Sequence, residues 1–257
     1  MCLIAWNWQP DSANPLLLMG NRDEFYARPA QALHHWPDAS ILAGRDVQAG
    51  GTWLGVERNG RLAALTNYRS PVLARQHAPS RGELVTDFLN SLLDAASYLE
   101  ALQSQATAYN PFNLLVYDGL SLLGLESREA NIVVLQPGIG AVSNADFNTP
   151  WPKLTQLTSS LANSLEHNAT EDTELWPLLQ SRAQALDNLL PQTGVPLELE
   201  RALSATFIAT PSYGTRASSL VRMSKDGVRF SEQSFGVNGA LGHTTLSAQW
   251  ADWPSGT

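Results

Sequence analysis

The chain has 257 residues, of which 44% are hydrophobic and 16% charged, a composition typical of a globular protein and not of a disordered one. The formal net charge is -8 at pH 7, and an acidic surface repels phosphate backbones, so we expect no nucleic-acid partner. A single cysteine excludes an internal disulfide framework, and no Cys/His spacing suggests a zinc site. The apolar run at 15–20 is too short to cross a membrane and no signal peptide is visible. We therefore expect a cytoplasmic protein without a membrane span.

The N-terminal part of the chain predicts two hairpins. Residues 2–8 and 16–20 are apolar, strand-like runs separated by turn-forming residues, and the second run continues directly into Asn21-Arg22-Asp23-Glu24. Residues 52–57 and 62–67 flank a turn with an Asn-Gly pair, which is a strong hairpin signal.

The middle of the chain alternates helical and strand-like segments. Ser80, followed three residues later by Glu83, has the pattern of a capping box and opens a predicted helix over 81–92. The other predicted segments are a helix at 95–108, strands at 113–117, 121–125, 131–135 and 141–143, and helices at 152–165, 171–189 and 198–203.

The last third returns to strand patterns, at 206–209, 218–223 and 228–235, whereas the Gly-, Ser- and Thr-rich residues after Phe235 predict irregular structure. Because neighbouring strands are joined by hairpins, the sheets should be mainly antiparallel. The order β, α, β, α, β favours two sheets face to face with helices outside each. We expect a single domain over residues 1–257.

Cys2 is the first candidate for chemistry. A small second residue usually allows the initiator methionine to be removed, which would leave a thiol nucleophile and an α-amine on one residue. The free amine has a pKa of roughly 7.7–8.0, so it can act as a general base near neutral pH. The alternative is that Cys2 is a small core residue at the start of a buried strand.

Arg22 and Asp23 are the next candidates, because a tight first hairpin brings them near Cys2. Arg22 could lower the pKa of the thiol and hold a carbonyl or carboxylate, and Asp23 could orient the α-amine. Adjacent residues of a strand face opposite ways, so both side chains reach Cys2 only if the strand bulges. The alternative is a solvated turn with a weak surface ion pair.

Three further residues could complete a site for acyl transfer. Asn67 and Asn144 each end a predicted strand, and their amides could donate hydrogen bonds to a tetrahedral oxyanion. Arg216 could be a second cationic clamp. The alternatives are turn chemistry for the asparagines and a solvated turn for the arginine.

Two aromatic features are ambiguous. The eight tryptophans could fill the core or line an apolar or planar ligand site. His34 and His35 are adjacent, so on a strand they would point to opposite faces and are poorly placed to bind a metal together. We expect no metal site.

Several segments together carry a family resemblance. Met1-Cys2 followed by Asn21-Arg22-Asp23-Glu24 resembles the signature of the NRDE family, also called the transport and Golgi organisation protein 2 family. Further segments resemble the family in the same order: Gly51-Thr52-Trp53-Leu54-Gly55, Thr66-Asn67-Tyr68-Arg69, Ser143-Asn144, Thr149-Pro150-Trp151-Pro152-Lys153 and Tyr213-Gly214-Thr215-Arg216. They span nearly the whole chain, which is therefore identified as a member of this family.

A more distant resemblance is to N-terminal-nucleophile hydrolases of the bile-salt hydrolase and penicillin V acylase type. It implies an α+β fold, the four-layer αββα sandwich, and a catalytic site built on a processed N-terminal cysteine. The residues that match this site are Cys2, Arg22, Asp23, Asn67, Asn144 and Arg216. One departure is that the arginine and the aspartate are adjacent here, whereas the acylases space them by two residues.

The resemblance implies two classes of function. The first is hydrolysis of a non-peptide C–N bond with Cys2 as nucleophile, which requires no cofactor. The second is non-enzymatic binding and trafficking of haem or of a lipid or acyl-CoA ligand, in keeping with the family's links to secretory organisation and haem mobilisation. Such a carrier would need an apolar cleft with a few polar anchors. In either case the partner is a small molecule, and the oligomeric state is left open.

Overall fold

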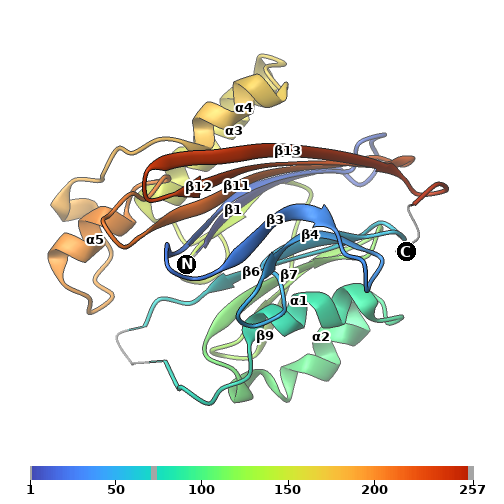
Figure 1. The fold of residues 1–257 in the computed structure, drawn as a ribbon, viewed down its shortest axis with the longest axis horizontal. Helices are drawn as coiled ribbons and strands as arrows, with labels where there is room; N and C mark the ends of the chain where they lie inside the picture. The colour runs from blue at the N-terminus through green and yellow to red at the C-terminus, as the bar shows by residue number, and fades with distance from the viewer. Residues whose placement is uncertain (1, 71–73, 254–257) are drawn as a thin grey trace.

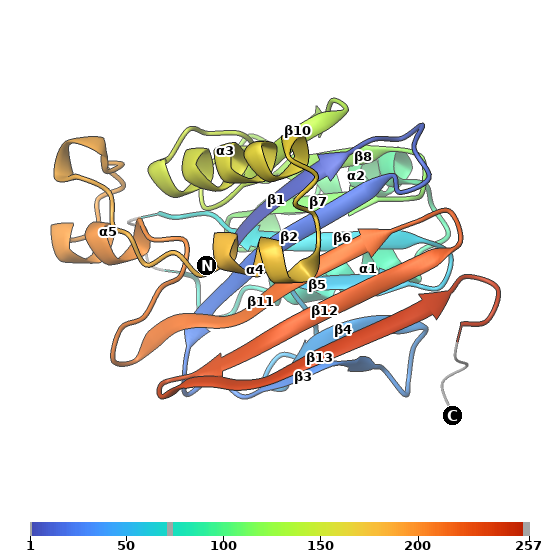
Figure 2. The same ribbon diagram turned by 90° about the horizontal axis from the view of Figure 1, so that it is seen from above.

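The computed structural model describes residues 2–70 and 74–253 and contains two antiparallel sheets packed face to face (Figure 1 and Figure 2). The strands are β1 (Cys2–Trp8), β2 (Leu16–Phe25), β3 (Ala30–His35), β4 (Ile41–Asp46), β5 (Leu54–Glu57), β6 (Arg61–Asn67), β7 (Phe112–Tyr117), β8 (Leu122–Glu126), β9 (Asn131–Val134), β10 (Gly138–Val142), β11 (Tyr213–Met223), β12 (Gly227–Gly236) and β13 (Gly239–Gln249). One sheet has the order β10-β1-β2-β11-β12-β13 and the other the order β3-β4-β5-β6-β7-β8-β9. Figure 2 shows how the first sheet places the N-terminal strands directly beside the C-terminal ones.

The first four helices in chain order cover the outer faces of the two sheets, and the fifth lies beyond one end of the sandwich (Figure 1 and Figure 2). They are α1 (Arg81–Asn90), α2 (Ala95–Gln103), α3 (Pro152–Glu166), α4 (Asp172–Leu179) and α5 (Leu197–Leu203), with short 3-10 turns η1 (Ala106–Ala108) and η2 (Asp187–Leu189). α1 and α2 share an apolar cluster with the β3–β9 sheet, and α3 and α4 share another with the sheet that contains β1. The layers follow the order α, β, β, α, so the α+β sandwich predicted from the sequence is confirmed.

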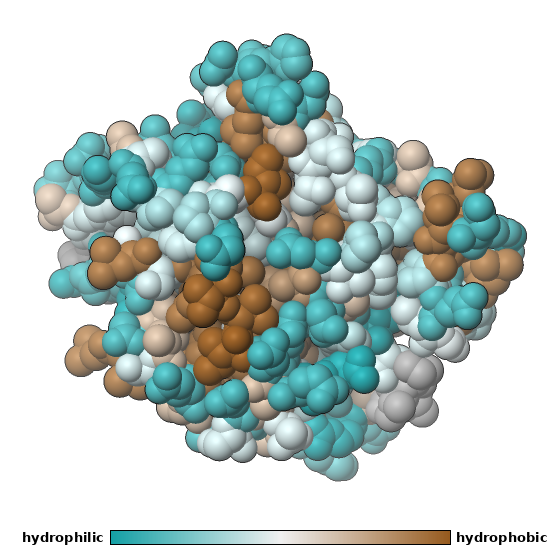
Figure 3. Space-filling model, turned by 180° about the vertical axis from the view of Figure 1, so that it is seen from behind, coloured by the Kyte–Doolittle hydropathy of each residue, from teal (hydrophilic) through white to brown (hydrophobic). Residues whose placement is uncertain are grey.

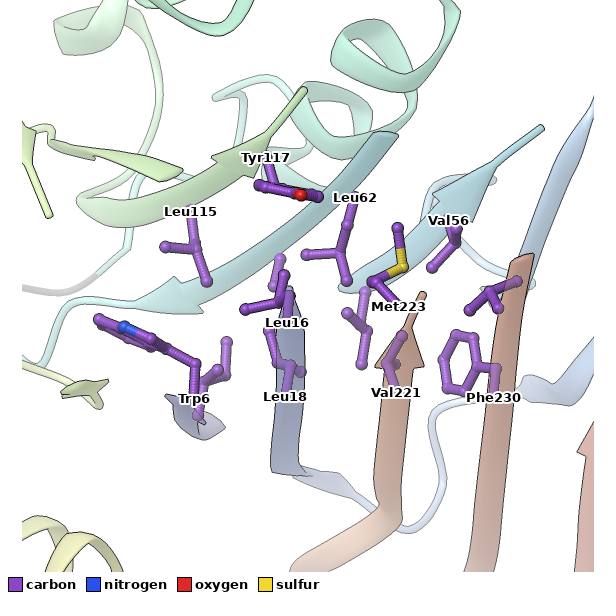
Figure 4. Close-up of a cluster of buried hydrophobic side chains, with 14 of the residues drawn as sticks. Trp6, Leu16, Leu18, Val56, Leu62, Leu115, Tyr117, Val221, Met223 and Phe230 are labelled. Atoms are coloured by element: carbon purple, nitrogen blue, oxygen red, sulfur yellow. The ribbon is translucent and has the colours of Figure 1, made fainter. Parts of the chain in front are cut away.

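The largest apolar cluster lies between the two sheets. Figure 4 shows Trp6 and Leu18 from one sheet facing Leu62 and Leu115 from the other. Alternate residues of β1 face the helices instead, and Leu3 and Ala5 pack in the cluster with α3 and α4. Because β1 is buried on both faces, its sequence is apolar almost throughout rather than alternating.

Most of the tryptophans are buried. The buried ones are Trp6, Trp8, Trp36, Trp53 and Trp176.

Seen from behind, the molecule exposes an apolar patch among polar side chains (Figure 3). Exposed apolar residues include Val134 on β9 and Ile139 on β10, which are edge strands of the two sheets. In the described ranges, no helix is long and apolar enough to cross a membrane.

The hairpins and most helices lie where the sequence predicts them, but strand lengths differ. β2 continues through residues 21–24, because β11 pairs with it as far as Phe25. The predicted strand at 206–209 is reduced to an isolated bridge between Ala209 and Gly214. β3 and β4 were not predicted.

Three further predictions were wrong. The residues after Phe235 are not irregular, since β13 pairs with β12 from Gly239 to Gln249. The helix predicted at 171–189 ends at Leu179. Ser80 is the N-cap of α1, but its side chain makes no capping hydrogen bond within the described structure, so the capping box does not form.

Candidate active site

A cavity of about 600 Å³ lies at the end of the sandwich where β1 begins, and residues of both sheets line it. Five of the six predicted site residues are among them: Cys2, Arg22, Asp23, Asn67 and Arg216. The volume lies within the range of small-molecule sites, roughly 300–1,000 Å³. The fold thus brings together residues that are more than two hundred positions apart in the chain.

Cys2 is buried at the start of β1 and pairs directly with Arg22 on β2. Directly opposed residues of an antiparallel pair point to the same face, so the guanidinium group and the thiol lie on the cavity side. Burial raises the pKa of the Cys2 thiol, and the Asp23 carboxylate adds to this rise, while Arg22 opposes it. The thiol is therefore protonated near neutral pH and needs a base before it can attack.

Asp23 lies on the other face of β2, since β2 pairs regularly with β1 and does not bulge there. The bulge is in β11 instead, between Thr215 and Ala217. Thr215 donates a hydrogen bond from Oγ1 to Asp23 Oδ1 at 2.8 Å, and the Tyr213 hydroxyl donates to the Asp23 carbonyl oxygen at 3.0 Å. Two residues of the Tyr-Gly-Thr-Arg segment thus fix Asp23 at the end of β2.

The two asparagines differ in position. Asn67 ends β6 and lines the cavity. Asn144 is fully buried and is not among the lining residues; its Nδ2 donates to the Asn67 carbonyl oxygen at 2.7 Å. Next to it, Ser143 Oγ donates to the Cys2 carbonyl oxygen at 3.0 Å. Asn144 therefore ties the two sheets together beside Cys2, and its predicted role as an oxyanion donor remains a prediction.

Arg216 lines the cavity but is held by backbone carbonyls. Its Nη1 donates to the carbonyl oxygens of Phe25, Tyr26 and Arg28 at 3.0, 3.2 and 2.9 Å. Its Nε donates to the Phe235 carbonyl oxygen at 3.1 Å. These bonds hold the turn after β2 against β12, and the predicted role as a second substrate clamp stays a prediction.

Lys153 is a residue that sequence reasoning did not single out. It lies in the first turn of α3 and is 2% exposed, with Nζ 3.4 Å from Asn144 Oδ1. Burial lowers the pKa of Lys153 to about 8, although the Asp23 carboxylate opposes this fall. A signal was present, because Lys153 shares the apolar face of the predicted helix with Leu154, Leu157 and Leu161.

A buried ion pair joins Asp23 and Lys153 in a cluster of charged side chains near Cys2. Arg69 Nη1 and Glu200 Oε2 are 2.5 Å apart, and their side chains are 4% and 5% exposed. The backbone amide of Arg69 also donates to the Asn144 carbonyl oxygen at 2.7 Å. Together with Asp23 and Lys153, the pair gives two cations and two anions, so the cluster can be neutral overall.

α1 brings a further cation to the cavity. Ser80, Arg81 and Gly82 line it, and Arg81 lies close enough to Cys2 and Glu24 for their charges to affect its pKa, which burial lowers. This packing depends on two glycines, because a Cβ atom at Gly51 would lie 2.5 Å from the carbonyl carbon of Gly82. Gly51 belongs to a segment whose function the sequence left unexplained.

The two sheets between helical layers form an αββα sandwich, the fold of N-terminal-nucleophile hydrolases. Among solved structures, the chain is similar to an arginine-to-leucine variant of the conjugated bile acid hydrolase from Clostridium perfringens. The TM-score is 0.54 at 9% sequence identity, and the match covers 100% of this chain and 94% of that chain. At this identity, the likeness shows the fold alone.

Sequence comparison shows the family. The model of the Transport and Golgi organisation 2 family matches residues 1–236, and the chain belongs to this family, as its motifs predict. It is 38% identical over 259 residues to the Transport and Golgi organization protein 2 homolog of Bos taurus, covering 91% of this chain and 93% of that protein. The human homolog is 35% identical over 262 residues, with the same shares covered.

Proposed function

We propose that the protein is an N-terminal cysteine amidohydrolase that acts on a non-peptide C–N bond. The observation that carries this proposal is the position of Cys2 on the wall of a cavity of about 600 Å³, directly opposite Arg22 and with Asn67 on the same cavity.

In this mechanism the base is the α-amine of Cys2, which becomes available when Met1 is removed; Met1 lies outside the described residues. The amine takes the thiol proton, and Sγ attacks the substrate carbonyl carbon to form a tetrahedral oxyanion. The C–N bond then breaks, and the amine leaving group takes the proton from the α-ammonium. Water hydrolyses the thioester that remains, with the α-amine again as base, which releases the acid and restores the thiol.

The other residues have supporting roles in this proposal. Asn67 donates a hydrogen bond to the oxyanion. Arg22 steers the substrate carbonyl or a carboxylate toward Sγ. Asp23, fixed by Thr215 and Tyr213, orients the α-amine at the start of β1.

The first measurement is the intact mass of the purified protein before and after treatment with a thiol-selective label. We expect the mass of Met1 to be missing and Cys2 to be labelled. Retained Met1 with an inert thiol, in protein from a host with an active methionine aminopeptidase, would make Cys2 structural and overturn the mechanism.

Replacement of the nucleophile tests the proposal directly. In a screen of N-acyl amides, Cys2→Ala should abolish turnover, because no other thiol is present in the chain. The Tm of the variant should stay close to that of the native protein. Arg58→Met is a matched control, because Arg58 is exposed in the turn between β5 and β6, away from the cavity, and its activity should be unchanged. A fully active Cys2→Ala protein would contradict the proposal.

A second candidate is a carrier of haem or of an acyl-CoA ligand. It is favoured by the combination of Arg22 and Arg28 with Trp53 on the cavity wall, since guanidinium groups bind propionates or phosphates and an indole ring packs on planar or apolar groups. A carrier should bind its ligand equally well after Cys2→Ala. A flat spectral titration with haem, together with no binding of acyl-CoA, would count against it.

A further inference from the structure

The charge of the cavity is opposite to that of the whole molecule. The chain has a formal net charge of -8, yet six arginines and four carboxylates line the cavity. The lining arginines are Arg22, Arg28, Arg45, Arg75, Arg81 and Arg216. A positive cavity in an acidic protein raises the local concentration of anions and keeps cations away.

The arginines differ in how their charges are balanced. Arg28 Nε lies 2.6 Å from Asp46 Oδ2, and Arg22 Nη2 lies 3.2 Å from the same oxygen. Arg45 pairs with Asp38 at 3.1 Å. Within 3.2 Å, these three cations therefore share two carboxylates.

Among the described residues, the side chains of the other three lining arginines donate hydrogen bonds to backbone carbonyls. Arg81 Nη1 donates to the Pro111 carbonyl oxygen at 3.0 Å, and Arg75 Nη2 donates to the carbonyl oxygens of Thr107, at 2.9 Å, and Tyr109. Neither Arg75 nor Arg81 forms an ion pair with any carboxylate of residues 2–70 or 74–253, and the same is true of Arg216.

Of the remaining carboxylates, Asp23 belongs to the buried layer with Lys153, and Glu232 and Glu24 do not remove this excess. Glu232 accepts hydrogen bonds from the Leu33 amide at 2.9 Å and the Ser234 hydroxyl at 3.3 Å, and burial raises the pKa of its carboxyl group. Glu24 lies 3.9 Å from Arg22 and close enough to Arg81 for its charge to affect the pKa of Arg81. One carboxylate thus stands between two guanidinium groups, and a guanidinium group that binds carbonyls keeps its full charge.

We infer that the molecule bound in this cavity carries an oxyanion group, a carboxylate or a phosphate, which is bound by Arg81 and Arg75 while the scissile amide lies against Cys2. The position of the scissile amide rests on the proposed function, whereas the binding of the anionic group by the arginines does not. Arg81 lines the cavity together with Cys2, and Arg75 is exposed at its edge, so the anionic group lies toward the opening. The first turn of α1 adds the positive end of its helix dipole on the same side.

Binding to Cys2→Ala protein tests the inference without any need for turnover. The probes are two matched pairs: N-octanoylglycine with its neutral glycinamide, and N-octanoyl-phosphoethanolamine with neutral N-octanoylethanolamine. Calorimetric titration should show that the anionic member of at least one pair binds roughly tenfold tighter or more, as charged hydrogen bonds contribute in proteins. The pair with the larger difference distinguishes a carboxylate from a phosphate. Equal affinity within both pairs, or no binding of any probe, would overturn the inference.

Variants of the arginines, made in the Cys2→Ala background, locate the anion. Arg81→Met and Arg75→Met should each weaken the anionic probes several-fold and leave the neutral ones unchanged, whereas Arg58→Met should leave both unchanged. Arg75 is exposed, so its replacement tests the inference even if Arg81→Met fails to fold. Equal effects of Arg75→Met and Arg58→Met would contradict the assignment. Anion binding by the Cys2→Ala protein, together with no hydrolysis of any of these amides by native protein from which Met1 has been removed, would support this inference while refuting the proposed amidohydrolase.

Discussion

At the scale of single residues, the candidate site depends on which way each side chain faces. Arg22 and Asp23 are adjacent, and β2 sends one side chain to the cavity and the other to the buried layer beneath α3. Asp23, Lys153 and the Arg69–Glu200 pair form that layer. Buried charges are tolerated when they are balanced, so this layer can hold a carboxylate at the end of β2 without water.

The lowered pKa of Lys153 predicts how the free energy of unfolding changes with pH. Its pKa is lowered from 10.5 to about 8 in the folded chain, so between these values the unfolded chain binds more protons. The free energy of unfolding should therefore rise with pH across this window, relative to Lys153→Met, by about 3 kcal/mol in total. Below about pH 8 both states are protonated, and the full unfavourable effect of burial is present.

The measurement is urea denaturation from about pH 7 to pH 10.5, comparing Cys2→Ala with Cys2→Ala/Lys153→Met so that the thiol does not titrate. A difference between the two proteins that stays constant with pH would show that the pKa of Lys153 is ordinary.

At the scale of elements, α1 reaches the cavity because two glycine backbones touch. The loop before β5 meets the first turn of α1 at Gly51 and Gly82, and the Thr52 amide donates to the Gly82 carbonyl oxygen at 3.4 Å. A side chain at Gly51 would push the helix away from the sheet, since its Cβ atom would lie 2.5 Å from the Gly82 carbonyl carbon. The position of Arg81 in the cavity therefore depends on a backbone contact and not on the helix sequence alone.

Two alanine substitutions separate this contact from backbone strain. Gly51→Ala should lower the free energy of unfolding by about 2–3 kcal/mol through overpacking and should speed amide exchange in the first turn of α1. Gly50 has a φ of +80° but nothing near its Cβ position, so Gly50→Ala should cost about 1–2 kcal/mol through strain without affecting that exchange. Hydrogen–deuterium exchange and urea denaturation measure both effects. Equal exchange in the two variants would show that the contact does not hold α1.

At the scale of the whole molecule, the core between the sheets joins both halves of the sandwich. Each sheet has one face in this core and the other against its own helices, so neither half keeps its core without the other. We therefore expect residues 1–257 to unfold as one unit.

Leu18→Ala tests this expectation, because Leu18 is fully buried between the sheets (Figure 4). The substitution should lower the free energy of unfolding by about 2–5 kcal/mol. Tryptophan fluorescence and far-ultraviolet circular dichroism should report the same transition in both proteins. Two separate transitions would indicate two domains.

The sequence by itself determined much of the local secondary structure. Apolar runs bounded by turn residues located β1, the hairpins and most helices, because side-chain periodicity and turn chemistry act over a few residues. The motif segments identified the family and five residues that line one cavity. The sequence did not predict β13, because this exposed edge strand has no apolar alternation and owes its conformation to pairing with β12.

Only the tertiary structure decided which residues meet and which charges are buried. Register between β1 and β2 set Arg22 against Cys2, and pairing with β11 set Asp23 against Thr215. Lysine is usually a surface residue, and although the periodicity of α3 puts Lys153 on its apolar face, only the packing of that helix buries it beside Asn144. Burial, pKa and cavity charge arise from contacts between distant segments, and composition and local periodicity do not specify which segments meet.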